Sequence, residues 1–213
     1  SNLFFKVSQK YKDYPIFSSI GSLADSLSLN LPILYVAYFF SLEVAGAFAI
    51  AYRIINIPIA FVGQAISQVF YRNTIEKADR IYLTRTTLLL TALLALIFTP
   101  FLLLVIYFGE PLLAFIFGDE WSLVGKITLY IIFAGFARFS ISPLSSILLA
   151  PTNLRLGVMW QILYLSTLSS TFFLLINSEF EKFLLFFALH EVILYIIYFI
   201  FILKGATNLK YKD

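Results

Sequence analysis

The sequence predicts an all-α membrane protein with six transmembrane helices. Hydrophobic residues make up 61% of its 213 residues and charged residues only 13%, whereas a soluble domain carries roughly 25% charged residues. The apolar runs continue for about 20 residues, as a bilayer-crossing helix requires, and do not alternate with a period of two as in a membrane β-barrel. The chain has no cysteine, which excludes disulfides and thiolate metal sites within it.

Six apolar stretches define the expected spans, which are residues 15–40, 45–72, 84–108, 122–150, 155–177 and 182–204. The second and fourth exceed the ~20 residues that a crossing needs, so we expect them to tilt or protrude. The apolar piece 111–118 is too short to cross and is expected to lie in the membrane interface.

The segments outside the spans are polar. Residues 1–14 have the composition of a linker and residues 205–213 that of a tail. The chain has neither an initiator methionine nor a signal-peptide pattern. We therefore expect it to be a piece of a longer protein.

The charges at the ends of the spans sort by side. One set of ends is basic, with Lys6, Lys10, Lys12, Arg72, Lys77, Arg80, Arg85, Arg155, Lys204, Lys210 and Lys212. The other set is mostly acidic, with Glu43, Glu110, Asp119, Glu120, Glu179 and Glu181 against Lys126 and Lys182. Basic loops stay in the cytoplasm, so we expect both ends of the chain inside a bacterial inner membrane and the loop 41–45 outside.

The second span carries a polar stripe. In GAFAIAYRIINIPIAFVGQAISQVFY (46–71), a helix of about 100° per residue places the polar residues on one face. These residues are Arg53, Asn56, Gln64, Ser67 and Gln68. A guanidinium in hydrocarbon costs several kcal/mol, so the stripe is expected to face protein or water and to mark a functional site.

Further polar residues occur in the other spans. The first span carries Asp25 and Asn30, the fourth Arg138, and the sixth His190 and Glu191. Matching their depths by the helical rise of 1.5 Å per residue suggests two ion pairs.

These pairs are Asp25 with Arg138 near mid-membrane and Arg53 with Glu191 nearer the outside. The plainer alternative is that such pairs only lock the bundle. His190 is either a satisfied interior group or part of a proton relay, since histidine titrates near neutrality.

The sequence shows no catalytic constellation. It lacks the metalloprotease, serine-hydrolase, phosphate-loop and dinucleotide-binding motifs. We therefore expect no enzyme activity, no cofactor and no metal. The basic residues are explained by membrane orientation, so no nucleic-acid binding is expected.

Four segments, in order, resemble the C-terminal half of bacterial polysaccharide (oligosaccharide) flippases of the multidrug/oligosaccharidyl-lipid/polysaccharide superfamily. They are YKDYPIF (11–17), NLPILYVAYFFSLEVAGAFAIAYRIINIPIAFVGQAISQVFYR (30–72), FIFGDEW (115–121) and ISPLSSILLAPTNLR (141–155). The resemblance implies two six-helix lobes around a central cavity, with this chain as the second lobe and the N-terminal lobe of the same protein as its partner. The first two helices of each lobe would line the cavity.

The resemblance also implies a function, the flipping of lipid-linked oligosaccharide, with a polyprenyl diphosphate carrier, by alternating access. Guanidinium groups suit phosphate, and amide and hydroxyl groups suit sugars. The expected substrate-binding residues are Arg53, Asn56, Gln64, Ser67, Gln68, Asn30, Asp25 and Arg138. The candidates for coupling to a cation or proton are Asp25, Glu191 and His190.

Three other functions compete with this one. A cation-coupled multidrug exporter of the same superfamily would need a carboxylate ion site, which Asp25 and Glu191 could supply. A membrane-embedded polysaccharide polymerase or transferase would need catalytic groups in a large outer loop, and the expected outer loops are short. A non-transporting scaffold would gain little from a polar helix face.

Overall fold

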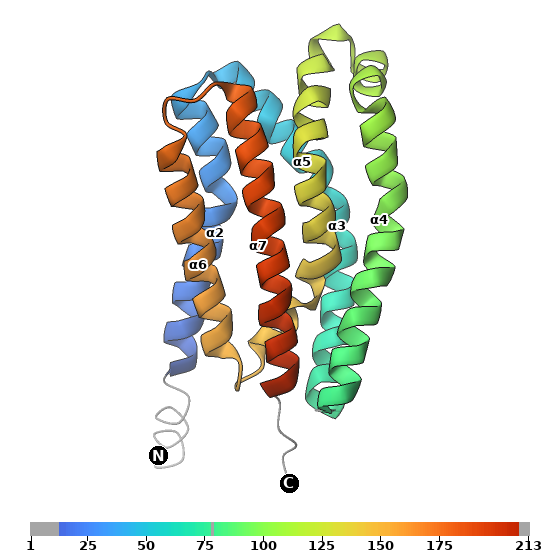
Figure 1. Cartoon of the computed structure of the whole chain (residues 1–213), viewed down its shortest axis with the longest axis vertical. Coiled ribbons are helices and arrows are strands. Elements are labelled where there is room, and N and C mark those ends of the chain that lie inside the picture. The colour runs from blue at the N-terminus through green and yellow to red at the C-terminus, as the bar shows by residue number, and fades with distance from the viewer. Residues whose placement is uncertain (1–12, 78, 209–213) are drawn as a thin grey trace, which may run out of the picture.

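The computed structural model describes residues 13–77 and 79–208, and within these ranges it contains helices and no strand (Figure 1). The α-helices are α2 (Asp13–Phe39), α3 (Leu42–Lys77), α4 (Arg80–Phe117), α5 (Ser122–Ile141), α6 (Leu154–Leu174) and α7 (Phe180–Asn208). Two 3₁₀ helices, η1 (Asp119–Trp121) and η2 (Ser142–Leu149), flank α5. The all-α prediction is confirmed for this part of the chain.

Five of these helices are long and apolar enough to cross a membrane, namely α2, α3, α4, α5 with η2, and α7. This indicates a multi-pass membrane protein. The helix α6 is not among them, although its 21 residues would extend about 30 Å. The reason is compositional, because hydroxyl side chains and Gln161 interrupt its apolar sequence LRLGVMWQILYLSTLSSTFFL. The predicted sixth crossing therefore stays a prediction.

Several helix boundaries differ from the predicted ones, and two of the differences change the architecture. Residues 111–118 do not form a separate interfacial piece, because α4 continues through Pro111 to Phe117 and ends at Gly118, whose φ is +100°. A proline removes one backbone donor without ending a helix that is packed along its side, and at 38 residues α4 extends about 57 Å.

The predicted fourth span, 122–150, divides into α5 and η2. The division falls at Ser142, and Pro143 follows at the beginning of the 3₁₀ helix. The missing amide hydrogen of the proline favours this change of helix type. As a result, the end of the span is turned toward α3, against which η2 packs.

The six α-helices run alternately up and down, so the beginning of α2 and the end of α7 lie at the same end of the bundle (Figure 1). In that view α2, α6 and α7 stand on one side, and α4 and α5 on the other. The helices α3 and α5 approach closely at Gly135, where an added Cβ would overlap the Ile55 side chain. This contact fixes α3 beside α5 at the depth of the polar side chains.

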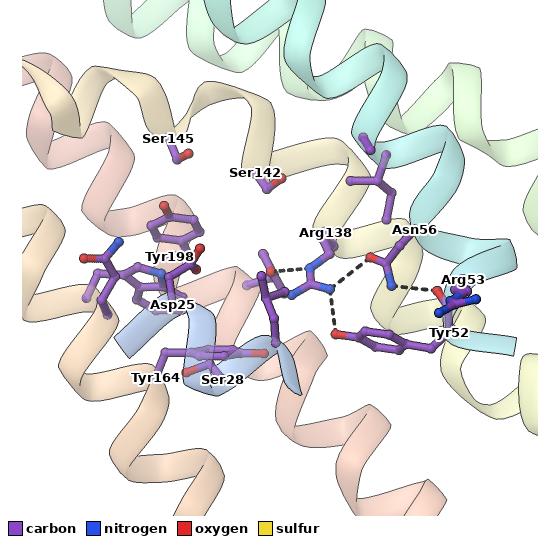
Figure 2. Close-up of a pocket in the computed structure, with 16 residues that line it drawn as sticks. Asp25, Ser28, Tyr52, Arg53, Asn56, Arg138, Ser142, Ser145, Tyr164 and Tyr198 are labelled. Atoms are coloured by element: carbon purple, nitrogen blue, oxygen red, sulfur yellow. Dashed lines mark hydrogen bonds between the residues drawn. The ribbon is translucent and has the colours of Figure 1, made fainter. Parts of the chain in front are cut away.

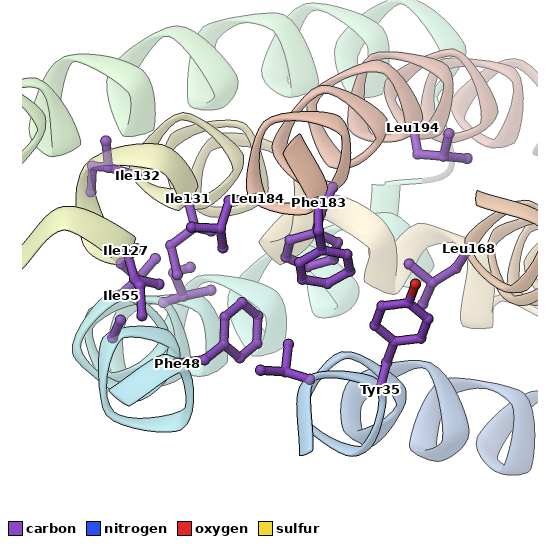
Figure 3. Packing of buried hydrophobic residues seen from close by; sticks show 14 of the residues in the cluster. Tyr35, Phe48, Ile55, Ile127, Ile131, Ile132, Leu168, Phe183, Leu184 and Leu194 are labelled. Carbon is purple, nitrogen blue, oxygen red and sulfur yellow. The ribbon is translucent and has the colours of Figure 1, made fainter. Parts of the chain in front are cut away.

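The interior has an apolar cluster toward each end. The aromatic cluster, at the end opposite the termini, consists of Tyr35, Phe48, Phe172, Phe183 and Phe187 (Figure 3). The Tyr35 and Phe183 rings stack with centroids 4.9 Å apart. A second cluster toward the termini includes Phe70, Leu83, Leu144, Ile147 and Ile202. The polar side chains around Arg138 lie between the two clusters.

Candidate functional site

An open cavity of about 440 Å³ lies among the helices at mid-depth. Residues from five α-helices and η2 line it, and most of them are polar or aromatic. From α2 and α3 they are Asp25, Ser28, Leu29, Tyr52, Arg53, Asn56, Ile59 and Ala60. From α5, η2, α6 and α7 they are Arg138, Ser142, Ser145, Trp160, Gln161, Tyr164, Tyr195 and Tyr198.

Arg138 is held in place by neutral partners (Figure 2). Its Nε donates to Tyr195 Oη at 2.6 Å. Its Nη1 donates to Tyr52 Oη at 2.8 Å and to Asn56 Oδ1 at 3.0 Å. The Asn56 amide is itself oriented, because its Nδ2 donates to the Tyr52 carbonyl oxygen at 2.7 Å.

The remaining nitrogen of this guanidinium is free to bind a ligand. Nη2 of Arg138 has no acceptor in the described part of the chain, and it carries two N–H donors. The guanidinium carbon also lies 5.8 Å from the Tyr52 ring centroid and 5.5 Å from that of Tyr195. The rings stabilise the cation electrostatically, and its charge is not paired with a carboxylate.

Neither predicted ion pair forms a direct salt bridge within the described ranges. Arg138 and Asp25 line the same cavity, but no ion pair within the described ranges joins them, and none joins Arg53 to Glu191. Depth along a helix does not fix the direction of a side chain. Arg138 finds its partners in hydroxyl and amide groups, while exposed Arg53 lines the cavity without a hydrogen bond to any described residue.

The hydrogen-bond partner of Glu191 lies on α6 and is not Arg53 of α3. Its Oε1 accepts a hydrogen bond from Tyr164 Oη at 2.6 Å and lies 3.5 Å from His190 Nδ1. His190 Nε2 is 3.1 Å from Thr167 Oγ1. Glu191 and His190 are only 2% and 9% exposed.

A second cavity, of only about 10 Å³, is lined by both Glu191 and Arg138. The carboxylate thus lies close behind the Arg138 network. Whether Glu191, His190 or Asp25 takes part in ion or proton coupling stays a prediction. Within the described ranges, no three His, Asp or Glu side chains gather as metal ligands would.

The polar stripe predicted on α3 continues beyond the cavity. Gln64, Ser67 and Gln68 line an adjoining groove of about 440 Å³, which shares Ile59, Ala60 and Ser142 with the first cavity. The stripe therefore lines two adjoining hollows. Asn30 lies outside both hollows, and its Nδ2 donates to the Ser26 carbonyl oxygen at 2.8 Å.

Sequence reasoning missed the tyrosines of the cavity and Gln161. Trp160 also lines the cavity, and its ring stacks on Tyr198 with centroids 4.1 Å apart. A signal was present in the sixth span. Glu191, Tyr195 and Tyr198 are spaced four and three residues apart, which places them on one face of a helix, like the stripe of the second span.

The sequence was also compared with known proteins. The sequence profile of the polysaccharide biosynthesis protein family matches residues 5–125, which include Asp25, Arg53 and Asn56. The teichuronic acid biosynthesis protein TuaB of Bacillus subtilis (strain 168) is 25% identical over 148 residues, which cover 68% of this chain and 30% of that protein. No solved structure matches. The family profile spans more than half of the chain, and the chain belongs to the polysaccharide biosynthesis protein family.

Proposed function

We propose that this protein flips lipid-linked oligosaccharide repeat units across the bacterial inner membrane for the biosynthesis of a surface polysaccharide. Family membership supports the role in polysaccharide biosynthesis, and the apolar helices support a membrane-bound substrate. The proposal rests mainly on the position of the Arg138 guanidinium. Three hydrogen bonds hold it, and two of its N–H donors stay free beside a polar cavity.

This arrangement suits a diphosphate. A guanidinium binds phosphate oxygens through parallel N–H donors, and Arg138 is already oriented, so little side-chain entropy is lost on binding. Arg53 supplies a second guanidinium at the same cavity. The two cations together match the charge of a polyprenyl diphosphate headgroup.

The rest of the cavity suits the glycan. Tyrosine hydroxyls and the Gln161 and Asn56 amides both donate and accept hydrogen bonds, as sugar hydroxyl groups require. The lipid tail would stay in the bilayer. The apolar outer faces of the helices, such as those with Phe61 and Leu96, are 78% and 69% exposed and can contact it.

The proposed mechanism is alternating access, in which two lobes rock around the bound substrate. In this proposal the chain is the second lobe of a longer transporter, all six helices cross the membrane, and both ends lie in the cytoplasm. The bundle supports this, because the beginning of α2 and the end of α7 lie at the same end (Figure 1). The proposed activity is transport and not catalysis.

The test uses a strain that lacks the gene, complemented with the complete gene product. Loss of the gene should remove the surface polysaccharide and accumulate lipid-linked precursor on the inner leaflet. Arg53→Ala should reproduce at least a tenfold accumulation, because it removes one of the two phosphate-binding cations. Arg72→Ala is the matched control, since Arg72 lies on the same helix in an exposed pair with Glu76, and such pairs contribute little.

Other outcomes would decide against the proposal. Normal surface polysaccharide at a normal protein level would remove Arg53 from the mechanism. Single repeat units at the outer surface after loss of the gene would indicate a polymerase. Intact polysaccharide together with sensitivity to cationic drugs would indicate a multidrug exporter.

A further inference from the structure

The cavity is electrically asymmetric. Figure 2 shows Asp25 on one side, near Tyr198 and Tyr164, and Arg53 on the other, with Arg138 between them. Asp25 comes from α2, while the two cations come from α3 and α5. A ligand with an anionic end and a hydroxyl-rich end would therefore be oriented by the cavity, because Asp25 repels phosphate and attracts hydroxyl donors.

The Asp25 side also holds an amide group without a partner. Gln161 of α6 lines the cavity and is partly buried, and its side chain makes no hydrogen bond to any described residue. Asp25 likewise has neither a hydrogen bond nor an ion pair there. On this side of the cavity, within the described part of the chain, Asp25 and Gln161 therefore both have polar atoms left for a ligand.

Gly21 brings the two groups together. An added Cβ at Gly21 would overlap Gln161 Oε1, so the amide lies directly over the glycine. Gly21 and Asp25 are four residues apart on α2, which places them on the same face one turn apart. The Gln161 amide of α6 therefore lies over α2, about one helical turn from Asp25.

Such a pair matches a sugar ring. A carboxylate accepts hydrogen bonds from two hydroxyl groups, and an amide donates to one hydroxyl and accepts from another. Neighbouring hydroxyl groups on a ring present this pattern of donors and acceptors. The aromatic rings of Trp160 and Tyr198 stand beside the pair in the same cavity and supply apolar contact.

We propose that Asp25 and Gln161 form the sugar-recognising end of the cavity and that Gly21 leaves the space in which the Gln161 amide is held. This proposal rests on the proposed transport function and deepens it. In this proposal Arg53 and Arg138 bind the diphosphate. The side chains of Asp25 and Gln161 form hydrogen bonds with the hydroxyl groups of the sugar attached to it. These residues thus determine which sugar is accepted and do not contribute to the affinity for the diphosphate itself.

A substitution at Gly21 tests the placement of the Gln161 amide directly. Gly21→Ala displaces Gln161, and because the overlapping atom is the end of a flexible side chain, the backbone need not move. Gly46→Ala on α3 is the matched control, since its added Cβ meets nothing within 4 Å. Gln161→Ala and Asp25→Asn remove the two recognising groups directly.

The experiment measures binding to the complete purified protein in lipid nanodiscs. The probes are farnesyl diphosphate without a sugar, its glucosyl ester and its N-acetylglucosaminyl ester. The wild type should bind at least one sugar-bearing probe about tenfold more tightly than the sugar-free one, as one or two net hydrogen bonds allow. Gly21→Ala, Gln161→Ala and Asp25→Asn should each lose about fivefold of this preference, while Gly46→Ala should keep it.

Two results would overturn the inference and leave the proposed function standing. One is a wild-type protein that binds all three probes equally. The other is a set of variants that weaken binding of the sugar-free probe as strongly as that of the sugar-bearing ones. A wild-type protein that binds none of the three would instead overturn the proposed function, and this inference with it.

Discussion

The aromatic cluster and the cavity are built from the same helices and behave in opposite ways. In the aromatic cluster, rings from α2, α3, α6 and α7 fill the interior, and Phe48 and Phe183 are fully buried. About one to three turns further along α3, the interior is open and lined with tyrosines, amides and cations. One region is closed by packing alone, and the other stays open around an ordered guanidinium.

The difference shows how a membrane bundle separates stability from recognition. Helices in lipid gain little from the hydrophobic effect, so close packing and hydrogen bonds hold them together. In the aromatic cluster each ring has several neighbours, as Phe183 does with Tyr35, Phe172 and Phe187. Around Arg138, by contrast, Nε and Nη1 each donate to particular acceptors, and Nη2 stays free for a ligand. We therefore expect substitutions in the cluster to affect stability and substitutions in the cavity to affect transport.

The largest loss of stability is expected for Phe183→Ala. The ring is 0% exposed, and removing a fully buried phenylalanine costs about 3–5 kcal/mol of unfolding free energy. Thermal unfolding of the purified complete protein measures the effect, and transport per folded molecule should change less than twofold.

Phe186 provides the control for this substitution. It lies on the same helix but is 44% exposed, so Phe186→Ala should lower the unfolding free energy by less than about 1 kcal/mol. Equal destabilisation by the two substitutions would show that the aromatic cluster does not hold α7 in place.

Substitutions of Arg138 should impair transport more than they impair stability. Arg138→Met removes three hydrogen bonds and leaves Tyr52, Asn56 and Tyr195 with less complete partners, which should cost about 2 kcal/mol of unfolding free energy. Transport should fall at least tenfold. Arg138→Lys should not restore transport, because one ammonium group cannot reproduce the fork of the guanidinium.

The measurements are precursor accumulation in cells and thermal unfolding of the purified protein. Tyr52→Phe is a milder substitution in the same network. It removes one of the three acceptors and should lower the unfolding free energy by about 1 kcal/mol. Restoration of full transport by lysine would show that only the charge at position 138 matters and not its orientation.

Much of the fold could be predicted from the sequence, because membrane helices satisfy their own backbone and apolar runs report their length. The six helices and their alternation follow from the apolar runs and the loop charges. The extension of α4 through Pro111 could not be predicted, since a proline in a helix is read as a break. The η2 segment was missed for a related reason, because helical periodicity alone does not distinguish 3₁₀ from α geometry over a few residues.

The cavity could be predicted less completely. The stripe of α3 was visible because a helix has a fixed period, so Arg53 and Asn56 were found. The partners of Arg138 come from α3 and α7, and contacts between distant segments depend on helix rotation, which a single sequence does not reveal. Glu191 was therefore assigned to Arg53, although its hydrogen-bond partner is Tyr164 of the neighbouring helix.

The smallest effect on stability is expected for Glu191→Gln. This substitution shows whether Glu191 belongs to the packed interior or to the cavity. Glutamine keeps an acceptor for Tyr164 Oη but replaces a charge-assisted hydrogen bond by a neutral one, which should cost about 1 kcal/mol. If the only role of Glu191 is to join α7 to α6, Tyr164→Phe should lower the unfolding free energy by a similar amount. The double variant should lower it no further than either single substitution, because both remove the same contact. Thermal unfolding of the three variants and the wild type provides the double-mutant cycle. A Glu191→Gln protein of unchanged stability whose transport nevertheless falls would place the carboxylate with the Arg138 network and its cavity, where the coupling of transport to a cation or proton would then have to be sought.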